Sequence, residues 1–246
     1  MPTRRPDADN AAEGSENLII NAAEVLRHFL CAGSGEKERM FCKMKRNTTK
    51  MLVEGAMMLA LAIVLSLITP FQKILPFGGS ITLVSMLPIC IYSIKYGIGK
   101  GLGVSFLFAV FQFVQGTVKD GLFGWGLTAG MLIACIVFDY FLAYTVLGLA
   151  GMFRKKGLGG WIAGIVIAML LRFASHFISG VYVFASTGKI WDDLDFIAEN
   201  KYIYSLVYNG AYMVPEIILT VLVTVILFKI PQVHRILTSA DSAEEQ

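Results

Sequence analysis

Six long apolar stretches, separated by short polar loops, make up most of the chain after residue 50. They lie at residues 51–69, 81–94, 99–115, 126–149, 159–184 and 204–228. Most of them reach the roughly 20 residues that a helix needs to cross the hydrocarbon core of a bilayer. Backbone polar groups cannot stay unpaired in lipid, so each stretch is expected to be helical where it faces lipid. The pattern predicts an all-α integral membrane protein, a six-transmembrane-helix bundle.

The basic residues of the loops predict how this bundle is oriented. Eleven of them lie at one set of helix ends: Lys43, Lys45, Arg46, Lys50, Lys95, Lys100, Arg154, Lys155, Lys156, Lys229 and Arg235. The loops at the other ends carry four, Lys73, Lys119, Lys189 and Lys201. Because Lys and Arg are in excess in cytoplasmic loops, we expect the N- and C-termini to be cytoplasmic.

The composition agrees with a multi-pass protein of the cell membrane. Hydrophobic residues make up 56% of the chain and charged residues only 16%, against roughly 25% charged in an average soluble domain. These values exclude a disordered chain and an ordinary soluble enzyme. The net charge of +3 is too small to suggest a nucleic-acid partner. The four cysteines have no paired spacing, so neither a disulfide nor a metal site is predicted.

The two ends of the chain differ from its middle. Residues 1–44 start with a polar segment that has no apolar period, and we expect a poorly ordered N-terminal extension there. Residues 45–235 are expected to form the six-helix membrane domain. Residues 236–246 form a polar C-terminal tail.

Three of the apolar stretches carry polar residues whose placement in lipid would be costly. Asp139 lies near the middle of the fourth stretch. In the fifth stretch, Arg172, His176 and Gly180 follow at i, i+4 and i+8, so they share one helix face. The sixth stretch has a polar stripe, with Tyr204 and Tyr208 beside it: Ser205, Asn209, Tyr212 and Glu216. Asp139 either pairs with Arg172 as a structural element or serves as the counter-charge of a cationic ligand.

Together these side chains could line a small aromatic pocket toward the outer half of the bundle. Tyr and Phe rings attract a cationic ring by about 0.5–2 kcal/mol each. A carboxylate, an imidazole and an amide can then fix the polar edges of the ligand. The pattern favours a flat, nitrogen-rich, positively charged small molecule.

Several motifs resemble one known family. They are Gly78-Gly79-Ser80-Ile81-Thr82-Leu83, Met86-Leu87-Pro88-Ile89, Asp139-Tyr140, Arg172-Phe173-x-x-His176-Phe177-Ile178-Ser179-Gly180 and Tyr204-Ser205-Leu206-Val207-Tyr208-Asn209-Gly210. With these motifs, residues 45–235 resemble the thiamine-specific substrate-binding subunits (S components) of energy-coupling factor (ECF) transporters, the ThiT family.

The resemblance implies a function and a set of contacts. Thiamine would be held near the outer face, capped by the loop that contains Phe71 and Phe77. The subunit would have no cofactor of its own and would work with a membrane coupling subunit and two ATPase subunits, which use the ATP. The family pattern maps the thiamine contacts onto Asp139, Tyr140, His176, Tyr204 and Asn209, with Gly180, Arg172 and Ser205 completing the substrate-binding set.

Two further features follow from the resemblance. Phe184 stands where the family has a ring-stacking Trp, so either Phe184 stacks on the ligand or Trp191 does so from the adjacent loop. The pair Ala56-x-x-x-Ala60 resembles the small-residue motif by which these subunits dock to the coupling subunit.

Other functions stay open from the residues alone. One is an S component for another vitamin. A second is a membrane enzyme that uses His176 and Asp139. A third is an ion-coupled carrier, for which an internal repeat would be expected, and none is visible between residues 51–150 and 151–230.

Overall fold

The computed structural model describes residues 36–68, 81–82, 84–190 and 196–233. Phe71, Phe77 and Trp191, residues 78–80 of the first family motif, and the C-terminal tail 236–246 therefore lie outside the described residues, as does most of the N-terminal extension. The chain divides into two compact units, Met1–Val53 and Glu54–Gln246. The second unit contains every residue that was predicted to bind substrate.

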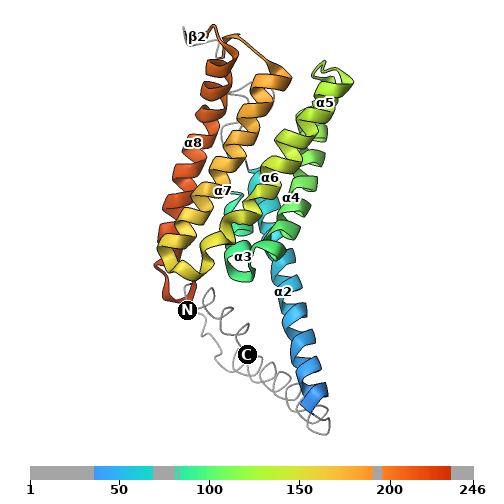
Figure 1. The fold of residues 1–246 in the computed structure, drawn as a ribbon, viewed down its shortest axis with the longest axis vertical. Helices are drawn as coiled ribbons and strands as arrows, with labels where there is room; N and C mark the ends of the chain where they lie inside the picture. Colours follow the sequence, from blue (N-terminus) through green and yellow to red (C-terminus); the bar gives the residue numbers. More distant parts are fainter. Residues whose placement is uncertain (1–35, 69–80, 83, 191–195, 234–246) are drawn as a thin grey trace, which may run out of the picture. The chain divides into compact units, whose positions relative to one another are not determined.

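Helices make up nearly all of the described residues (Figure 1). In chain order they are α2 (Glu36–Leu67), α3 (Leu87–Tyr96), α4 (Ile98–Lys119), η2 (Leu122–Gly124), α5 (Ala129–Cys135), η3 (Ile136–Leu142), α6 (Ala143–Thr145), η4 (Val146–Lys156), α7 (Gly157–Ser179), η5 (Gly180–Phe184) and α8 (Lys201–Phe228). Two short strands, β1 (Gly188–Lys189) and β2 (Ile197–Ala198), pair antiparallel, with Gly188 opposite Ala198.

Four helical stretches of the described residues are long and apolar enough to cross a membrane: Asn47–Leu67, Ile98–Lys119, Ala129–Phe184 and Lys201–Phe228. The third is too long for one crossing. Its backbone leaves helical geometry at Phe153 (φ −112°, ψ 24°), and α7 then packs back against η4. The prediction of a mostly helical, multi-pass membrane protein is confirmed, and the exact count of six membrane helices stays a prediction.

The second predicted span differs most from its expected form. Residues 81–94 were expected to cross the bilayer, but α3 begins only at Leu87 and has 10 residues. At 1.5 Å per residue it is about 15 Å long, half the thickness of the hydrocarbon core. Pro88, in the first turn of α3, marks this late start, because proline is favoured at the beginning of a helix.

One apolar core joins most of these helices. It includes Ala62 of α2, Ile89 of α3, Phe108 of α4, Leu147 of η4 and Met169 of α7, all fully buried. Near it, the Ser93 hydroxyl donates to the carbonyl of Gly148 (2.5 Å) and accepts from the amide of Gly151 (3.1 Å). This packing holds α3 and η4 against each other.

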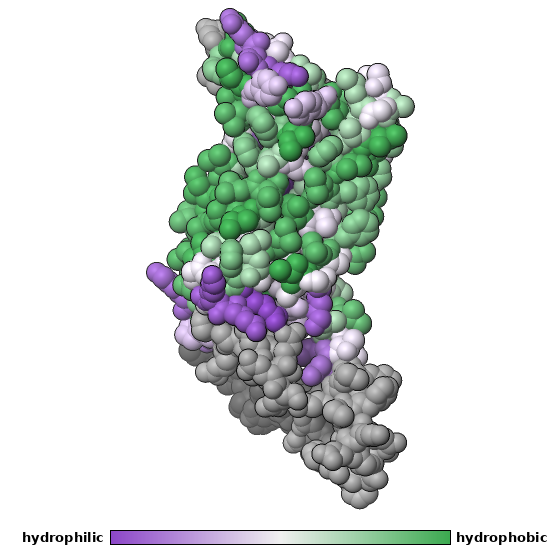
Figure 2. All heavy atoms as spheres, viewed as in Figure 1, coloured by the Kyte–Doolittle hydropathy of each residue, from purple (hydrophilic) through white to green (hydrophobic). Residues whose placement is uncertain are grey.

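The outer surface of the helices is apolar. On the face that Figure 2 shows, hydrophobic residues cover the middle of the helices, and polar residues gather toward their ends. On α8, for example, Ile218, Leu222 and Ile226 are all more than half exposed, and they follow one another at i, i+4 and i+8. Such a continuous apolar face is typical of helices that contact lipid.

Candidate functional site

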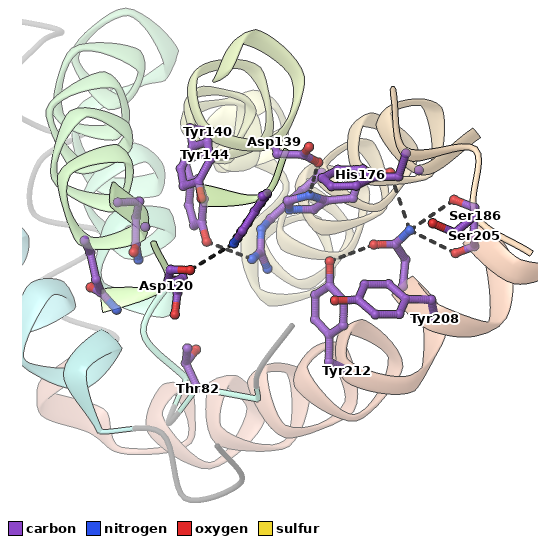
Figure 3. Close-up of a pocket in the computed structure, with 18 of the residues that line it drawn as sticks. Thr82, Asp120, Asp139, Tyr140, Tyr144, His176, Ser186, Ser205, Tyr208 and Tyr212 are labelled. Carbon is purple, nitrogen blue, oxygen red and sulfur yellow. Dashed lines mark hydrogen bonds and ion pairs between the residues drawn. The ribbon is translucent and has the colours of Figure 1, made fainter. Parts of the chain in front are cut away.

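A pocket lies among α4, η3, α7, η5 and α8, and it holds about 1000 Å³ of space, the open space at its mouth included (Figure 3). Every residue that was predicted to bind substrate lines this pocket: Asp139, Tyr140, Arg172, His176, Gly180, Phe184, Tyr204, Ser205 and Asn209. The fold thus brings together side chains from three of the predicted stretches, and their role in binding stays a prediction.

Asp139 is held by two side chains of α7. Its Oδ1 lies 2.8 Å from Nδ1 of His176, and its Oδ2 accepts a hydrogen bond from the Ser179 hydroxyl. The alternative that Asp139 pairs with Arg172 is therefore wrong, because Arg172 pairs with Glu216 instead. Asp139 is also only partly buried, so this carboxylate faces the pocket and can meet a ligand.

His176 keeps one nitrogen for a ligand. A carboxylate only accepts hydrogen bonds, so Nδ1 carries the proton that it donates to Asp139. In a neutral imidazole, Nε2 is then an acceptor. This Nε2 is buried and has no hydrogen-bond partner among the described residues. A donor group of a bound molecule would supply the missing partner.

Two short π-helical segments carry site residues. Asp139 and Tyr140 belong to η3, and Gly180 and Phe184 belong to η5. A π turn contains an extra residue compared with an α turn, and such turns are frequent at functional sites. The residue pattern along both stretches is compatible with a regular α-helix, so neither π-helical segment was predicted from the sequence.

The contact between η5 and α8 is unusually close. A Cβ at Gly180 would overlap the Ser205 hydroxyl and press on the amide nitrogen of Asn209. The Ser205 hydroxyl donates to the Phe177 carbonyl (2.9 Å), and Nδ2 of Asn209 donates to the Ser205 carbonyl (2.9 Å). The Tyr212 hydroxyl donates to Oδ1 of Asn209 (2.8 Å). These bonds fix the orientation of the Asn209 amide at the pocket wall.

Aromatic rings form a second part of this wall (Figure 3). Tyr204 and Tyr208 stack with their ring centroids 6.2 Å apart and their planes at 10°. Tyr212 meets Tyr208 edge-on at 6.0 Å and His176 at 6.2 Å. Such a set of rings presents both faces and edges to a planar ligand.

The opposite wall was missed by the sequence analysis. It comes from α4 and the turn after it, where Gln112, Gln115, Gly116 and Asp120 line the pocket. These positions follow at i, i+3, i+4 and i+8 along α4 and the residue directly after it, so a stripe at helical spacing was present in the sequence. Burial raises the pKa of the Asp120 carboxyl above its ordinary value, and the charge of neighbouring Lys119 partly offsets this.

Trp125 was also missed. It lines the pocket beside Phe184, with their ring centroids 5.9 Å apart and their planes at 55°. The indole N–H donates to the backbone carbonyl of Asp120 (2.9 Å), which fixes the ring at the pocket wall. A tryptophan is therefore available to stack on a ligand. It comes from the turn after α4, and not from the loop with Phe71 and Phe77 or the loop with Trp191.

Tyr140 depends on the absence of a side chain opposite it. A Cβ at Gly116 would overlap the Tyr140 hydroxyl, so the tyrosine packs directly on the backbone of α4. Its ring also meets Phe113 edge-on, with centroids 5.8 Å apart and planes at 79°. These contacts hold the Tyr140 hydroxyl at the pocket.

Arg172 is surrounded by partners from other helices. Its Nη1 lies 3.3 Å from Oε2 of Glu216, and its Nη2 donates to the Tyr144 hydroxyl (3.1 Å). The guanidinium also lies 4.7 Å from the centre of the Tyr144 ring. The other Glu216 oxygen accepts from the Thr82 hydroxyl. The positive charge at the pocket wall is thus paired with a carboxylate behind it.

The predicted docking residues lie elsewhere, on α2. Ala56 and Ala60 are exposed, whereas Ala62 is fully buried in the apolar core. The small-residue face of Ala56 and Ala60 therefore does not extend to Ala62. Large apolar side chains beside the two exposed alanines, such as Met57 and Leu61, are exposed as well.

Comparisons with known proteins agree on one family. The model of the family "Thiamine transporter protein (Thia_YuaJ)" matches residues 52–235. The chain is 30% identical over 193 residues to the thiamine transporter ThiT of Bacillus subtilis (strain 168), and the match covers 72% of this chain and 89% of that protein.

A solved structure of ThiT from Listeria monocytogenes has a similar fold. The TM-score is 0.56 at 21% sequence identity, and the match covers 76% of this chain and 98% of the other. The family-model match and the Bacillus relative show the family directly, and the Listeria structure shows the fold. The chain belongs to the thiamine transporter protein family, whose members are transporters and not enzymes.

Proposed function

We propose that this chain is the substrate-binding subunit (S component) of an ECF-type transporter in the cell membrane. It captures thiamine from outside the cell and delivers it inward. The observation that carries this proposal is the pocket, where Asp139, His176 and Asn209 face one space among aromatic rings. The proposal includes the six membrane helices of residues 45–235, the cytoplasmic termini, and the flanking segments 1–44 and 236–246.

The chemistry of thiamine matches the chemistry of the walls. Its thiazolium ring carries a permanent positive charge, which Asp139 and the stacked tyrosine rings attract. Its aminopyrimidine ring offers donors and acceptors along one edge. Nε2 of His176, which has no partner in the part of the chain that the structure describes, and the oriented amide of Asn209 suit such an edge.

In this proposal, partner subunits supply the energy for uptake. A membrane coupling subunit and two ATPase subunits convert ATP hydrolysis into movement of the bound subunit. Ala56 and Ala60 form the docking surface, because small exposed residues on α2 allow a partner helix to approach closely.

Isothermal titration calorimetry of the purified chain in detergent tests the binding step. We expect saturable binding of thiamine, and no binding of riboflavin or biotin at the same concentrations. Tight binding of riboflavin or biotin instead of thiamine would favour an S component for another vitamin. Failure of the folded chain to bind thiamine would overturn the proposal.

Uptake of labelled thiamine tests the partnership. Cells that express the chain together with a coupling subunit and ATPases should accumulate thiamine. Cells in which the ATPases are inactivated by substitution should bind thiamine without accumulating it. Equal accumulation in both would show that the chain transports without these partners.

A further inference from the structure

We propose that Glu216 sets the selectivity of the pocket: by neutralising Arg172, it makes the site prefer thiamine to the phosphate esters of thiamine. This inference rests on the proposed function and goes beyond it, since it concerns which form of the ligand is accepted. Glu216 acts as a positioning and charge-compensating residue, because it does not line the pocket itself.

The placement of the two charges supports this role. Arg172 lines the pocket, whereas Glu216 is 1% exposed and lies behind it on α8. Nη1 of Arg172 and Oε2 of Glu216 are 3.3 Å apart. Thr82 donates to the other carboxylate oxygen, which holds Glu216 in position.

The remaining charges of the pocket are negative. Of the described residues that line it, Arg172 is the only lysine or arginine, while Asp120 and Asp139 both contribute carboxylates. With Arg172 paired to Glu216, the field in the pocket therefore favours a cation. A phosphate group would meet two carboxylates and only a compensated guanidinium.

An Arg172 whose charge is not paired with a carboxylate would instead favour binding of a phosphate group. A guanidinium is a preferred partner of phosphate, because its planar N–H groups match the phosphate oxygens. Nε of Arg172 is buried and has no partner among the described residues. Replacing Glu216 by a neutral side chain of the same shape would leave the positive charge of Arg172 uncompensated at the pocket wall. In a protein interior, such a charge would attract a phosphate group strongly.

The test compares the dissociation constants of thiamine and thiamine monophosphate, measured by calorimetry on the wild type and on Glu216→Gln. Glutamine keeps one oxygen that can accept from Arg172, and its amide nitrogen can donate to the Thr82 hydroxyl, which also accepts hydrogen bonds, so the local geometry can persist. We expect the ratio of the two constants, monophosphate over thiamine, to fall by about tenfold or more in the variant. An unchanged ratio, or an equal loss of affinity for both ligands, would overturn the proposal.

Arg172→Gln supplies the reciprocal measurement. It removes the positive charge and leaves Glu216 unpaired, so the same ratio should rise. A role of the pair in packing alone gives no reason for opposite shifts in the two variants. If Glu216→Gln does not fold, Arg172→Gln still decides the matter, because a falling or constant ratio would contradict the proposal.

Thr224→Val is the matched control. Thr224 is a buried polar residue on the same helix, eight positions after Glu216, and among the described residues its hydroxyl donates only to the Thr220 carbonyl (2.6 Å). Its substitution should leave the ratio of the two dissociation constants at the wild-type value.

The proposed function and this inference can fail separately. If the wild type does not bind thiamine, the proposed function is wrong. If the wild type binds thiamine but Glu216→Gln does not change the ratio of the two dissociation constants, only this inference is wrong.

Discussion

His176 and Asp139 lie 37 positions apart in the chain, yet their side chains approach to 2.8 Å between Nδ1 and Oδ1. The contact joins α7 to η3, and Ser179 adds a second hydrogen bond one turn further along α7. A carboxylate near the middle of an apolar stretch is thereby solvated by protein donors while it faces the pocket.

Substitution of Asp139 tests its role as the counter-charge of thiamine. Asp139→Asn keeps the shape and removes the negative charge, so thiamine affinity should fall by about tenfold or more. Calorimetry gives the affinity, and size-exclusion chromatography in detergent checks that the variant is folded. Affinity equal to that of the wild type would remove Asp139 from the site.

His176→Ala tests the imidazole separately. It removes the Nε2 that has no partner among the described residues and takes away one support of Asp139, so thiamine binding should again weaken by about tenfold or more. The double variant with Asp139→Asn should lose less than the sum of the two single losses, because the residues act together. Strict additivity in the double-mutant cycle would argue against a coupled pair.

Gly180→Ala tests the close contact of η5 with α8. The added Cβ would overlap the Ser205 hydroxyl, so the segments must separate, which costs about 1–3 kcal/mol of stability and displaces Asn209. Thermal unfolding in detergent should show a lower Tm, and calorimetry should show weaker thiamine binding. Gly210→Ala on α8 is the matched control, since its Cβ meets nothing within 4 Å and its Tm should not fall.

Gly116→Ala tests how Tyr140 is held at the pocket. The new methyl group would overlap the Tyr140 hydroxyl and push the ring away from α4. Thiamine binding is expected to weaken several-fold, as it should in Tyr140→Ala. Gly103→Ala, on the same helix with open space around its Cβ, should bind thiamine as the wild type does; a loss of affinity there would point to a general effect on α4.

The Asp120 carboxyl is expected to make thiamine binding depend on pH. Burial raises the pKa of its carboxyl, so as the pH falls the negative charge is lost at a higher pH than the ordinary value of 3.8. Attraction of the thiamine cation should weaken as the pH falls through this raised pKa. The ionised form is the one that burial disfavours, so protonation of Asp120 should not itself destabilise the fold.

Asp120→Asn is the control for this pH dependence. Because the titration of thiamine itself is common to both proteins, the difference between the two affinity profiles isolates the contribution of Asp120. Calorimetry across the acidic range should give a flatter profile for the variant. Superimposable profiles would show that Asp120 does not contribute to the binding of the cation.

The helices and much of the site were predictable, because both depend on local pattern. Long apolar stretches fix where helices form in a membrane, and polar residues at helical spacing identified Arg172, His176 and Asn209 as one side of a pocket. The stripe of Gln112, Gln115 and Asp120 follows the same logic and was overlooked because no charge lies at the centre of α4.

Other features depend on contacts between distant segments. The spacing along the chain left open whether Asp139 would pair with Arg172, and only the packing of α7 against α8 gives Arg172 its partner Glu216. The burial of Ala62 likewise follows from which face of α2 meets the core. Neither the ion pair of Arg172 nor the burial of Ala62 can be predicted from the sequence of one helix alone.

The two π-helical segments make the site sensitive to chain length. Each contains a wider turn than an α-helix, which accommodates one extra residue. Deleting one residue from Ile136–Leu142 would let the segment wind as a regular α-helix, with the helix after it facing as before. Asp139 and Tyr140, which lie within the segment, would then change the direction in which they point. The loss of a single apolar residue beside Asp139 can therefore misplace this carboxylate although no polar side chain is replaced.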